Sequence, residues 1–275
     1  MTGSPLGQLT ALPARIRWAA GAVRLIVREP ADGLDRAFVR ARRFLGGAAT
    51  EEYEADPDWE RRLHERLGHV WPCEAAPEFQ ALWSDVVGSL EAQGLAIGRG
   101  TYGGWDDADP GLARAVWCLT RHLRPLKVVE TGVARGVTSR VILEALERNG
   151  DGQLWSIDLP ALDETLHTQI AAAVPESLRS RWTYVSGTSR RRLPGLLAGL
   201  GEIDLFVHDS SHTTRNLRFE LDQAWAALRA GAVVADDIQS NAAFGPFVRS
   251  RPDSASLVAR ADDGNAMFGI ALKGV

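Results

Sequence analysis

The chain has 275 residues, of which 45% are hydrophobic and 24% charged, the composition of a globular protein with a sizeable core. Its formal net charge of -4 disfavours nucleic acid as a partner, because proteins that bind nucleic acid usually carry a basic face. No stretch approaches the roughly 20 apolar residues of a transmembrane span, and arginines interrupt the apolar runs that an N-terminal secretory signal would need. We therefore expect a cytoplasmic protein with no transmembrane segment.

Residues 1–100 are expected to form a helical N-terminal region. The first 50 residues carry eight arginines against three acidic residues, whereas residues 51–110 are strongly acidic. The helix expected over 13–28 is basic and amphipathic, a pattern that can lie on an anionic membrane surface. Packing against the chain's own acidic region or a second subunit is the preferred interpretation, so the region would be a cap or a homodimer contact. Further helices are expected over 32–44, 58–67 and 77–93.

From Lys127 onward, short β-branched apolar runs alternate with helical stretches, which implies parallel strands joined by crossover helices. Residues 101–275 are therefore expected to form one α/β domain, with a doubly wound, Rossmann-like, mostly parallel seven-stranded sheet. A hairpin over 256–259 and 267–272 should close that sheet in antiparallel fashion. The other strands are expected over 127–131, 154–157, 182–185, 205–207 and 232–235. The helices are expected over 137–148, 162–173, 190–199 and 214–229, the last ending at Gly231.

Glycines and polar residues follow the first strand, at Glu130, Gly132, Gly136 and Thr138. Ligands of open parallel sheets bind at the carboxyl ends of the strands, and glycines there let a ligand approach the backbone and the next helix N-terminus. Such a turn alone can equally serve plain strand-to-helix packing. Asp158 ends the second strand about 26 residues beyond Gly132, where an acid can accept hydrogen bonds from ribose hydroxyls. Together the two features favour a nucleoside site.

Carboxylates also end the fourth and fifth strands. Asp209 and His212 follow strand four, and Asp236 and Asp237 follow strand five, so all four should meet at one sheet edge. Taken singly, each aspartate could end a strand or cap a helix, and His212 could orient the helix beginning near Thr214. Their joint placement at strand ends favours a site.

These motifs resemble a known family. The pattern Glu-x-Gly-x-x-x-Gly-x-Thr, followed by an acid at the end of the second strand, resembles the cofactor site of class I S-adenosylmethionine-dependent methyltransferases. The likeness is greatest to metal-dependent O-methyltransferases of the catechol and caffeoyl-CoA type. It implies that Gly132 and Gly136 pass the methionine part of the cofactor, that Thr138 lies near its carboxylate and that Asp158 binds the ribose. Glu130 would support the loop from the strand end.

The resemblance covers about residues 100–275 and extends to the acidic residues. It implies that Asp209, Asp236 and Asp237 hold a divalent cation, although Asp237 stands where the family has asparagine. Oxygen ligands of this kind favour Mg²⁺, or Mn²⁺ or Ca²⁺, over Zn²⁺. His212 stands where the family often places a lysine that accepts the substrate's proton. With an unperturbed pKa of about 6.5, depressed further by a nearby cation, its neutral imidazole would act as the base.

Three other features carry weaker expectations. Tyr102 and Trp105 lie before the helix that leads into the first strand. Either could line the cofactor pocket, or could belong to a turn rich in capping residues. The resemblance places the adenine ring beside residues 187–189. His208 should point away from its neighbours on strand four and serve a structural role.

Only two cysteines occur, Cys73 and Cys118. Two are too few for a disulfide framework, and they lack the paired spacing of a zinc site. Reduced thiols in a cytoplasmic protein are the expected state.

The expected function is therefore that of an S-adenosylmethionine-dependent O-methyltransferase. It would act on a hydroxyl of a small molecule, such as a diol, a catechol or a sugar, with assistance from Mg²⁺. One alternative is a metal-independent methyltransferase in which Asp209 and His212 act as base and orienter alone. Another is a non-catalytic scaffold or binding protein with the same fold. An NAD-dependent oxidoreductase is disfavoured, because the loop lacks the Gly-x-Gly spacing.

Overall fold

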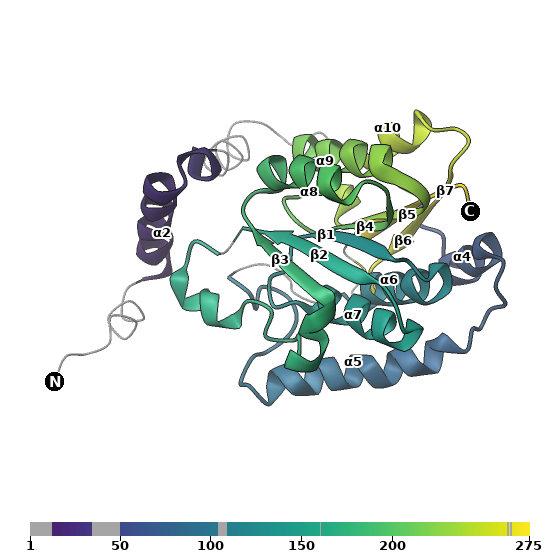
Figure 1. Cartoon of the computed structure of the whole chain (residues 1–275), viewed down its shortest axis with the longest axis horizontal. Helices are drawn as coiled ribbons and strands as arrows, with labels where there is room; N and C mark the ends of the chain where they lie inside the picture. Colours follow the sequence, from purple (N-terminus) through teal and green to yellow (C-terminus); the bar gives the residue numbers. More distant parts are fainter. Residues whose placement is uncertain (1–12, 35–49, 104–108, 160, 263, 265) are drawn as a thin grey trace.

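A seven-stranded sheet forms the frame of the protein, in a computed structural model that describes residues 13–34, 50–103, 109–159, 161–262, 264 and 266–275 (Figure 1). The strand order is β3-β2-β1-β4-β5-β7-β6. β1 to β5 pair in parallel, and β7 runs antiparallel to both β5 and β6. The predicted fold class is thereby confirmed. The strands are β1 Lys127–Thr131, β2 Gln153–Asp158, β3 Trp182–Ser186, β4 Ile203–His208, β5 Leu228–Ala235, β6 Ala255–Arg260 and β7 Met267–Lys273.

Helices cover both faces of the sheet, which explains why the central strands are apolar along nearly their whole length (Figure 1). Val128 packs with α6 and α7 on one face, and its neighbour Val129 packs with α8 and α9 on the other, because side chains alternate along a strand. The helices of the first face are α6 Pro110–Leu123 and α7 Val137–Asn149, backed by α4 Trp59–Leu67 and α5 Ala75–Glu91. Those of the second face are α8 Ser189–Leu200, α9 Thr214–Ala227 and α10 Phe244–Arg249.

The N-terminal region is helical where the structure describes it. α2 (Ala14–Arg28), α4 and α5 confirm the helices predicted over 13–28, 58–67 and 77–93. Residues 30–34 are helical as well, and the rest of the helix predicted over 32–44 lies outside the described residues. Of the helices described, none is long and apolar enough to cross a membrane.

The helix predicted over 162–173 is wrong. The structure has a short 3₁₀ helix there, η1 Glu164–Gln169. Backbone amides of this segment are used elsewhere: Ala171 donates to the carbonyl of Ala134, and Ala173 to that of Arg135. Since these bonds fasten the segment to the loop after β1, it cannot continue as an α-helix.

Gly231 does not end a helix, contrary to prediction. α9 ends at Ala227, and Gly231 lies inside β5 with a φ of 139°. A Cβ at this position would lie 1.9 Å from the carbonyl oxygen of Asp204 on the neighbouring strand. The glycine is therefore required by close strand packing.

Candidate active site

The loop after β1 passes directly against the end of β4. Gly132 has a φ of 89°, and a Cβ there would lie 1.8 Å from the carbonyl oxygen of Asp209. The amide of Asp209 donates to the carbonyl of Thr131 (2.8 Å), and the amide of Gly132 donates to that of Ile157 (2.9 Å). Only glycine fits this close contact between the loop and the backbone of Asp209. The predicted cofactor loop and the first of the predicted metal ligands are thus in contact.

Gly136 starts α7. It adopts a left-handed conformation with a φ of 78°, and a Cβ there would lie 3.0 Å from the side chain of Val174. Thr138 lies half-buried in the first turn of the helix. The unpaired amides and the positive end of the helix dipole are therefore presented at the loop, where they favour an anionic group such as a carboxylate.

Glu130 is buried between α7 and β2. One carboxylate oxygen, Oε2, accepts hydrogen bonds from the hydroxyls of Ser139 and Ser156, both at 2.6 Å. Burial raises the pKa of Glu130 to about 8, although the two serines oppose that shift. Such an arrangement fits the supporting role predicted for Glu130, because it links β1, β2 and α7.

Asp158 lies half-buried at the end of β2, beside the loop. Its Oδ2 accepts a hydrogen bond from the amide of Ala134 (3.2 Å), and its carbonyl accepts one from Gly187, after β3. The N-terminal region reaches the same edge, since the hydroxyl of Thr188 donates to the buried Asp32 (2.9 Å). The segment predicted to lie beside adenine is thus contacted by residues far away in the sequence.

Arg135, within the loop, was not among the predicted residues. Its guanidinium is buried and donates to the side chain of Gln169 (2.8 Å) and to the carbonyl of Thr101 (3.0 Å). It also lies over the ring of Tyr102, 5.6 Å from the centroid. Arg135 therefore fastens the segment before α6 to the loop, with Tyr102 buried there; Trp105 lies outside the described residues.

The four acidic and histidine residues predicted after β4 and β5 come together. Nδ1 of His212 lies 2.7 Å from Oδ2 of Asp237. Nε2 of His212 lies 3.7 Å from Oδ1 of Asp209 and 3.9 Å from Oδ2 of Asp236. The left-handed conformation of Asp237, with a φ of 51°, separates its side chain from that of Asp236. We call these four residues the acid cluster.

Electrostatics within the acid cluster differ from the sequence expectation. Burial lowers the pKa of His212, but the neighbouring carboxylates of Asp209, Asp237 and Asp236 outweigh it and raise that pKa well above its usual value. Burial alone would raise the pKa of Asp237, yet its bond to His212 lowers it to about 2. Burial and the charge of Asp209 raise the pKa of Asp236. The neighbouring carboxylates therefore favour the protonated imidazole, whereas an unperturbed pKa would favour the neutral ring.

The acid cluster also fits a small cation. Ligand atoms of Asp209, His212 and Asp236 lie within 4.8 Å of one another. Nε2 of His212 is buried and makes no hydrogen bond within the described part of the chain. Two carboxylates that converge in this way, Asp209 and Asp236, are a donor pair for a divalent cation, with His212 beside them.

A buried hydrogen-bond network centred on Glu220 of α9 lies next to the acid cluster. Glu220 accepts from Nδ1 of His208 (2.5 Å), from the hydroxyl of Thr131 (2.6 Å) and from Asn216 (2.7 Å). Burial opposes ionisation of Glu220, but the interaction with His208 lowers its pKa to about 2. His208 therefore has the structural role predicted for it. The sequence analysis did not single out Glu220. An acid on the apolar face of the helix predicted over 214–229 could have indicated a buried polar contact.

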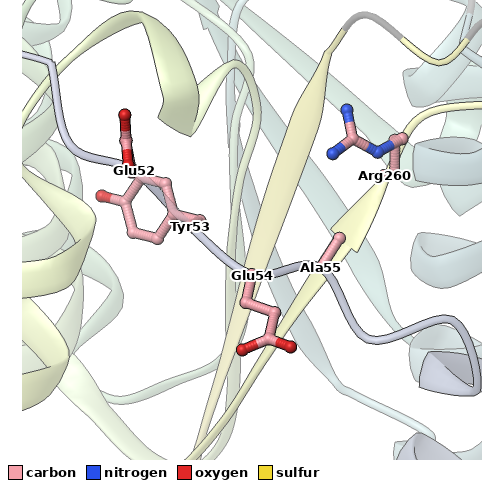
Figure 2. Close-up of a pocket in the computed structure, with 5 residues that line it drawn as sticks. All are labelled: Glu52, Tyr53, Glu54, Ala55 and Arg260. Carbon is pink, nitrogen blue, oxygen red and sulfur yellow. The ribbon is translucent and has the colours of Figure 1, made fainter.

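A surface pocket lies along edge strand β6, apart from the acid cluster and the loop after β1 (Figure 2). None of the residues described above lines it. Its lining residues are Glu52, Tyr53, Glu54, Ala55 and Arg260.

The strand order, the glycine turn after β1 and the acid ending β2 agree with the arrangement expected from the resemblance to S-adenosylmethionine-dependent methyltransferases. Residues 129–238 match the family model of a methyltransferase domain. Comparison with curated proteins finds no match.

Two solved structures share the fold. One is the O-methyltransferase TomG from Streptomyces achromogenes, involved in tomaymycin synthesis and solved in complex with SAM. It is 16% identical, with a TM-score of 0.51, over 79% of this chain and 99% of that chain. The other is an O-methyltransferase from Bacillus cereus in complex with SAH, 12% identical with a TM-score of 0.51, over 77% of this chain and 96% of that chain. At such identities the likeness concerns the fold.

Proposed function

We propose that the protein methylates a hydroxyl of a small molecule, with S-adenosylmethionine as the methyl donor. The observation that carries the proposal is the position of His212. Its buried Nε2 faces Asp209 and Asp236, and Asp209 contacts the glycine loop at Gly132. A proton acceptor and a cation-binding pair therefore lie next to the loop that would hold a methyl donor.

The cofactor would lie along the loop and the two adjacent strand ends. Gly132 and Gly136 let it approach the backbone, Thr138 and the α7 N-terminus would bind its carboxylate, and Asp158 its ribose hydroxyls. Glu130 holds the loop in place without needing to touch the ligand. S-adenosylmethionine supplies a methyl group on a positively charged sulfur.

His212 is proposed as the base that takes the acceptor's proton at Nε2. Asp237, bonded to Nδ1, fixes the ring and stabilises the imidazolium that results. We propose that Asp209 and Asp236 hold a divalent cation, Mg²⁺ or Mn²⁺. The sequence predicted Asp237 as a third ligand of that cation, and we propose instead that Asp237 orients His212. Such a cation would neutralise the carboxylates that retain the proton on His212 and would acidify a bound hydroxyl. Two adjacent oxygens, as in a catechol, vicinal diol or sugar, suit such a site.

Methyl transfer to a panel of catechols, vicinal diols and sugars tests the proposal, with S-adenosylhomocysteine as the measured product. D209A, D236A and H212A should each lower turnover by about 100-fold or more, the usual contribution of a positioned base or cation. D222A serves as the matched control, because Asp222 pairs with arginines on the surface of α9. Exhaustive chelation should abolish turnover, and Mg²⁺ or Mn²⁺ should restore it.

Other results would overturn parts of the proposal. Activity that survives chelation, together with an active D236A variant, would establish metal-independent transfer by His212 and Asp237. Failure of the wild-type protein to bind S-adenosylhomocysteine in calorimetry would show that the fold serves as a non-catalytic scaffold.

A further inference from the structure

A second group of potential metal ligands lies between α4 and α6, apart from the acid cluster. It contains His64 near the end of α4, Cys73 in the connection to α5 and Cys118 on α6, all three buried. Their ligand atoms lie within 4.8 Å of one another. Since α6 leads into the start of β1, Cys118 lies toward the sheet edge opposite the carboxyl ends of the strands.

His122 completes this group. It lies one helical turn beyond Cys118, so both side chains project from the same face of α6. Its ring meets that of His64 edge-on, with 4.9 Å between the centroids. The side chain of Cys73 interacts with those of Cys118, His122 and His64. We call these four residues the Cys-His cluster.

The imidazole of His64 is oriented as a metal ligand would be. Its Nδ1 lies 2.6 Å from the carbonyl oxygen of Glu60, which can only accept, so Nδ1 carries the proton and Nε2 a lone pair. Nε2 is buried and makes no hydrogen bond in the described ranges, and the same is true of Nε2 of His122. Metal-binding histidines are typically held by such a bond from their other nitrogen, whereas an unbonded nitrogen in a core is costly.

We propose that His64, Cys73, Cys118 and His122 bind one zinc ion. Two thiolates and two imidazoles are a donor set that tetrahedral zinc prefers, and four protein ligands complete that geometry. The ligands come from α4, the segment that follows it, and α6. The ion therefore joins the N-terminal region to the helix that precedes β1, and its role is structural. The proposal is independent of the proposed methyl transfer.

Titration of the reduced wild-type protein with Co²⁺ tests this site. We expect thiolate-to-cobalt charge-transfer absorption and the visible bands of tetrahedral cobalt, saturating at one ion per chain and lost on addition of Zn²⁺. Cobalt bound to the acid cluster has no sulfur ligand, so D236A should keep the charge-transfer absorption in full. C73S should lower it by about half, because one of two thiolates remains.

A stability measurement separates a structural ion from an incidental one. Removal of zinc from the wild-type protein should lower its Tm by several degrees, and readdition should restore it. H122N should lose that response, while H167N should keep it, because His167 lies exposed in η1.

Three results would overturn the proposal. One is an absence of charge-transfer absorption in the reduced wild type, which decides the matter even if C73S fails to fold. A second is an unchanged absorption in C73S. The third is a Cys73–Cys118 disulfide in the protein as isolated, seen as two missing thiols, which would identify the pair as an oxidisable dithiol.

Discussion

Glu130 is a buried acid whose folded-state pKa lies far above its unfolded value. In the unfolded chain the carboxyl titrates near its ordinary 4.5, whereas in the folded protein the pKa is raised to about 8 by burial. Between those values the folded state holds a proton that the unfolded state has released. The stabilisation is therefore complete below pH 4.5 and is lost as the pH rises through about 8, with a slope of up to about 1.4 kcal/mol per pH unit.

The E130Q variant removes that titration while keeping the shape of the side chain. Its free energy of unfolding, measured by urea denaturation between pH 5.5 and 8.5, should depend less on pH than that of the wild type. E147Q, at an exposed position of α7, should show the wild-type slope. Equal slopes in E130Q and wild type would contradict the assigned pKa.

Glu220 shows the opposite shift. Its folded-state pKa of about 2 lies below the ordinary 4.5, because the interaction with His208 overcomes burial. Its contribution to stability is therefore present above pH 4.5 and is lost as the pH falls through about 2. E220Q should cost about 3 kcal/mol at neutral pH, because an amide cannot accept from all of these donors and leaves buried groups unpaired. Urea denaturation measures the loss, and E202Q, at an exposed site, should cost almost nothing.

At the scale of single elements, Arg135 holds the segment before α6 against the cofactor loop. R135K keeps the charge but loses the planar guanidinium, which donates hydrogen bonds to both Gln169 and Thr101. We expect its affinity for S-adenosylhomocysteine to fall about 10-fold, equivalent to about 1.4 kcal/mol. Calorimetry measures this change, with R179K as the control, since Arg179 lies on the surface over Trp182. An unchanged affinity would mean that the segment does not cover the cofactor.

The strands were predictable because each is a short apolar run whose identity depends on its own residues. The segment 162–173 was not, because its amides bond the carbonyls of Ala134 and Arg135, and no local pattern reveals such partners. Gly231 was misread for a similar reason: the crowding comes from Asp204 on another strand. Local chemistry therefore identified the elements, and non-local backbone contacts decided the exceptions.

The candidate site was likewise predictable where chain order determines it, and unpredictable where non-local contacts do. Parallel strands bring their carboxyl ends to one edge, so the meeting of Asp209, His212 and Asp236 could be predicted from chain order alone. Which carboxylate bonds which nitrogen of His212 depends on the left-handed backbone at Asp237, and that was beyond the sequence. The Cys-His cluster was beyond it too, because its ligands extend from position 64 to position 122 and only the packing of α4 on α6 brings them together.

At the scale of the whole molecule, α2 lies at the side of the molecule (Figure 1), where ion pairs attach it to the body and some of its apolar side chains are exposed. Arg17 binds Asp163 at 2.9 Å and Arg24 binds Glu164 at 2.8 Å, in the segment that follows β2. Val23 and Val27 are 62% and 74% exposed. These ion pairs join α2 to the segment after β2, whereas the sequence predicted packing against the acidic region 51–110 or a second subunit. The exposed valines remain available to a second copy.

Homodimerisation through α2 therefore remains a prediction that solution measurement can test. In a symmetric dimer the same apolar face would bury itself against its copy, at a gain of about 1.5 kcal/mol or more for each fully buried valine. Wild-type protein should sediment as a dimer, and V23D/V27D should sediment as a monomer, because buried aspartates would face each other unpaired. V70D is the control for an added surface aspartate, since Val70 is more exposed (81%) and lies just beyond α4. A wild-type monomer, or a dimer that V23D/V27D leaves intact, would show that α2 is a cap on its own chain and no subunit contact.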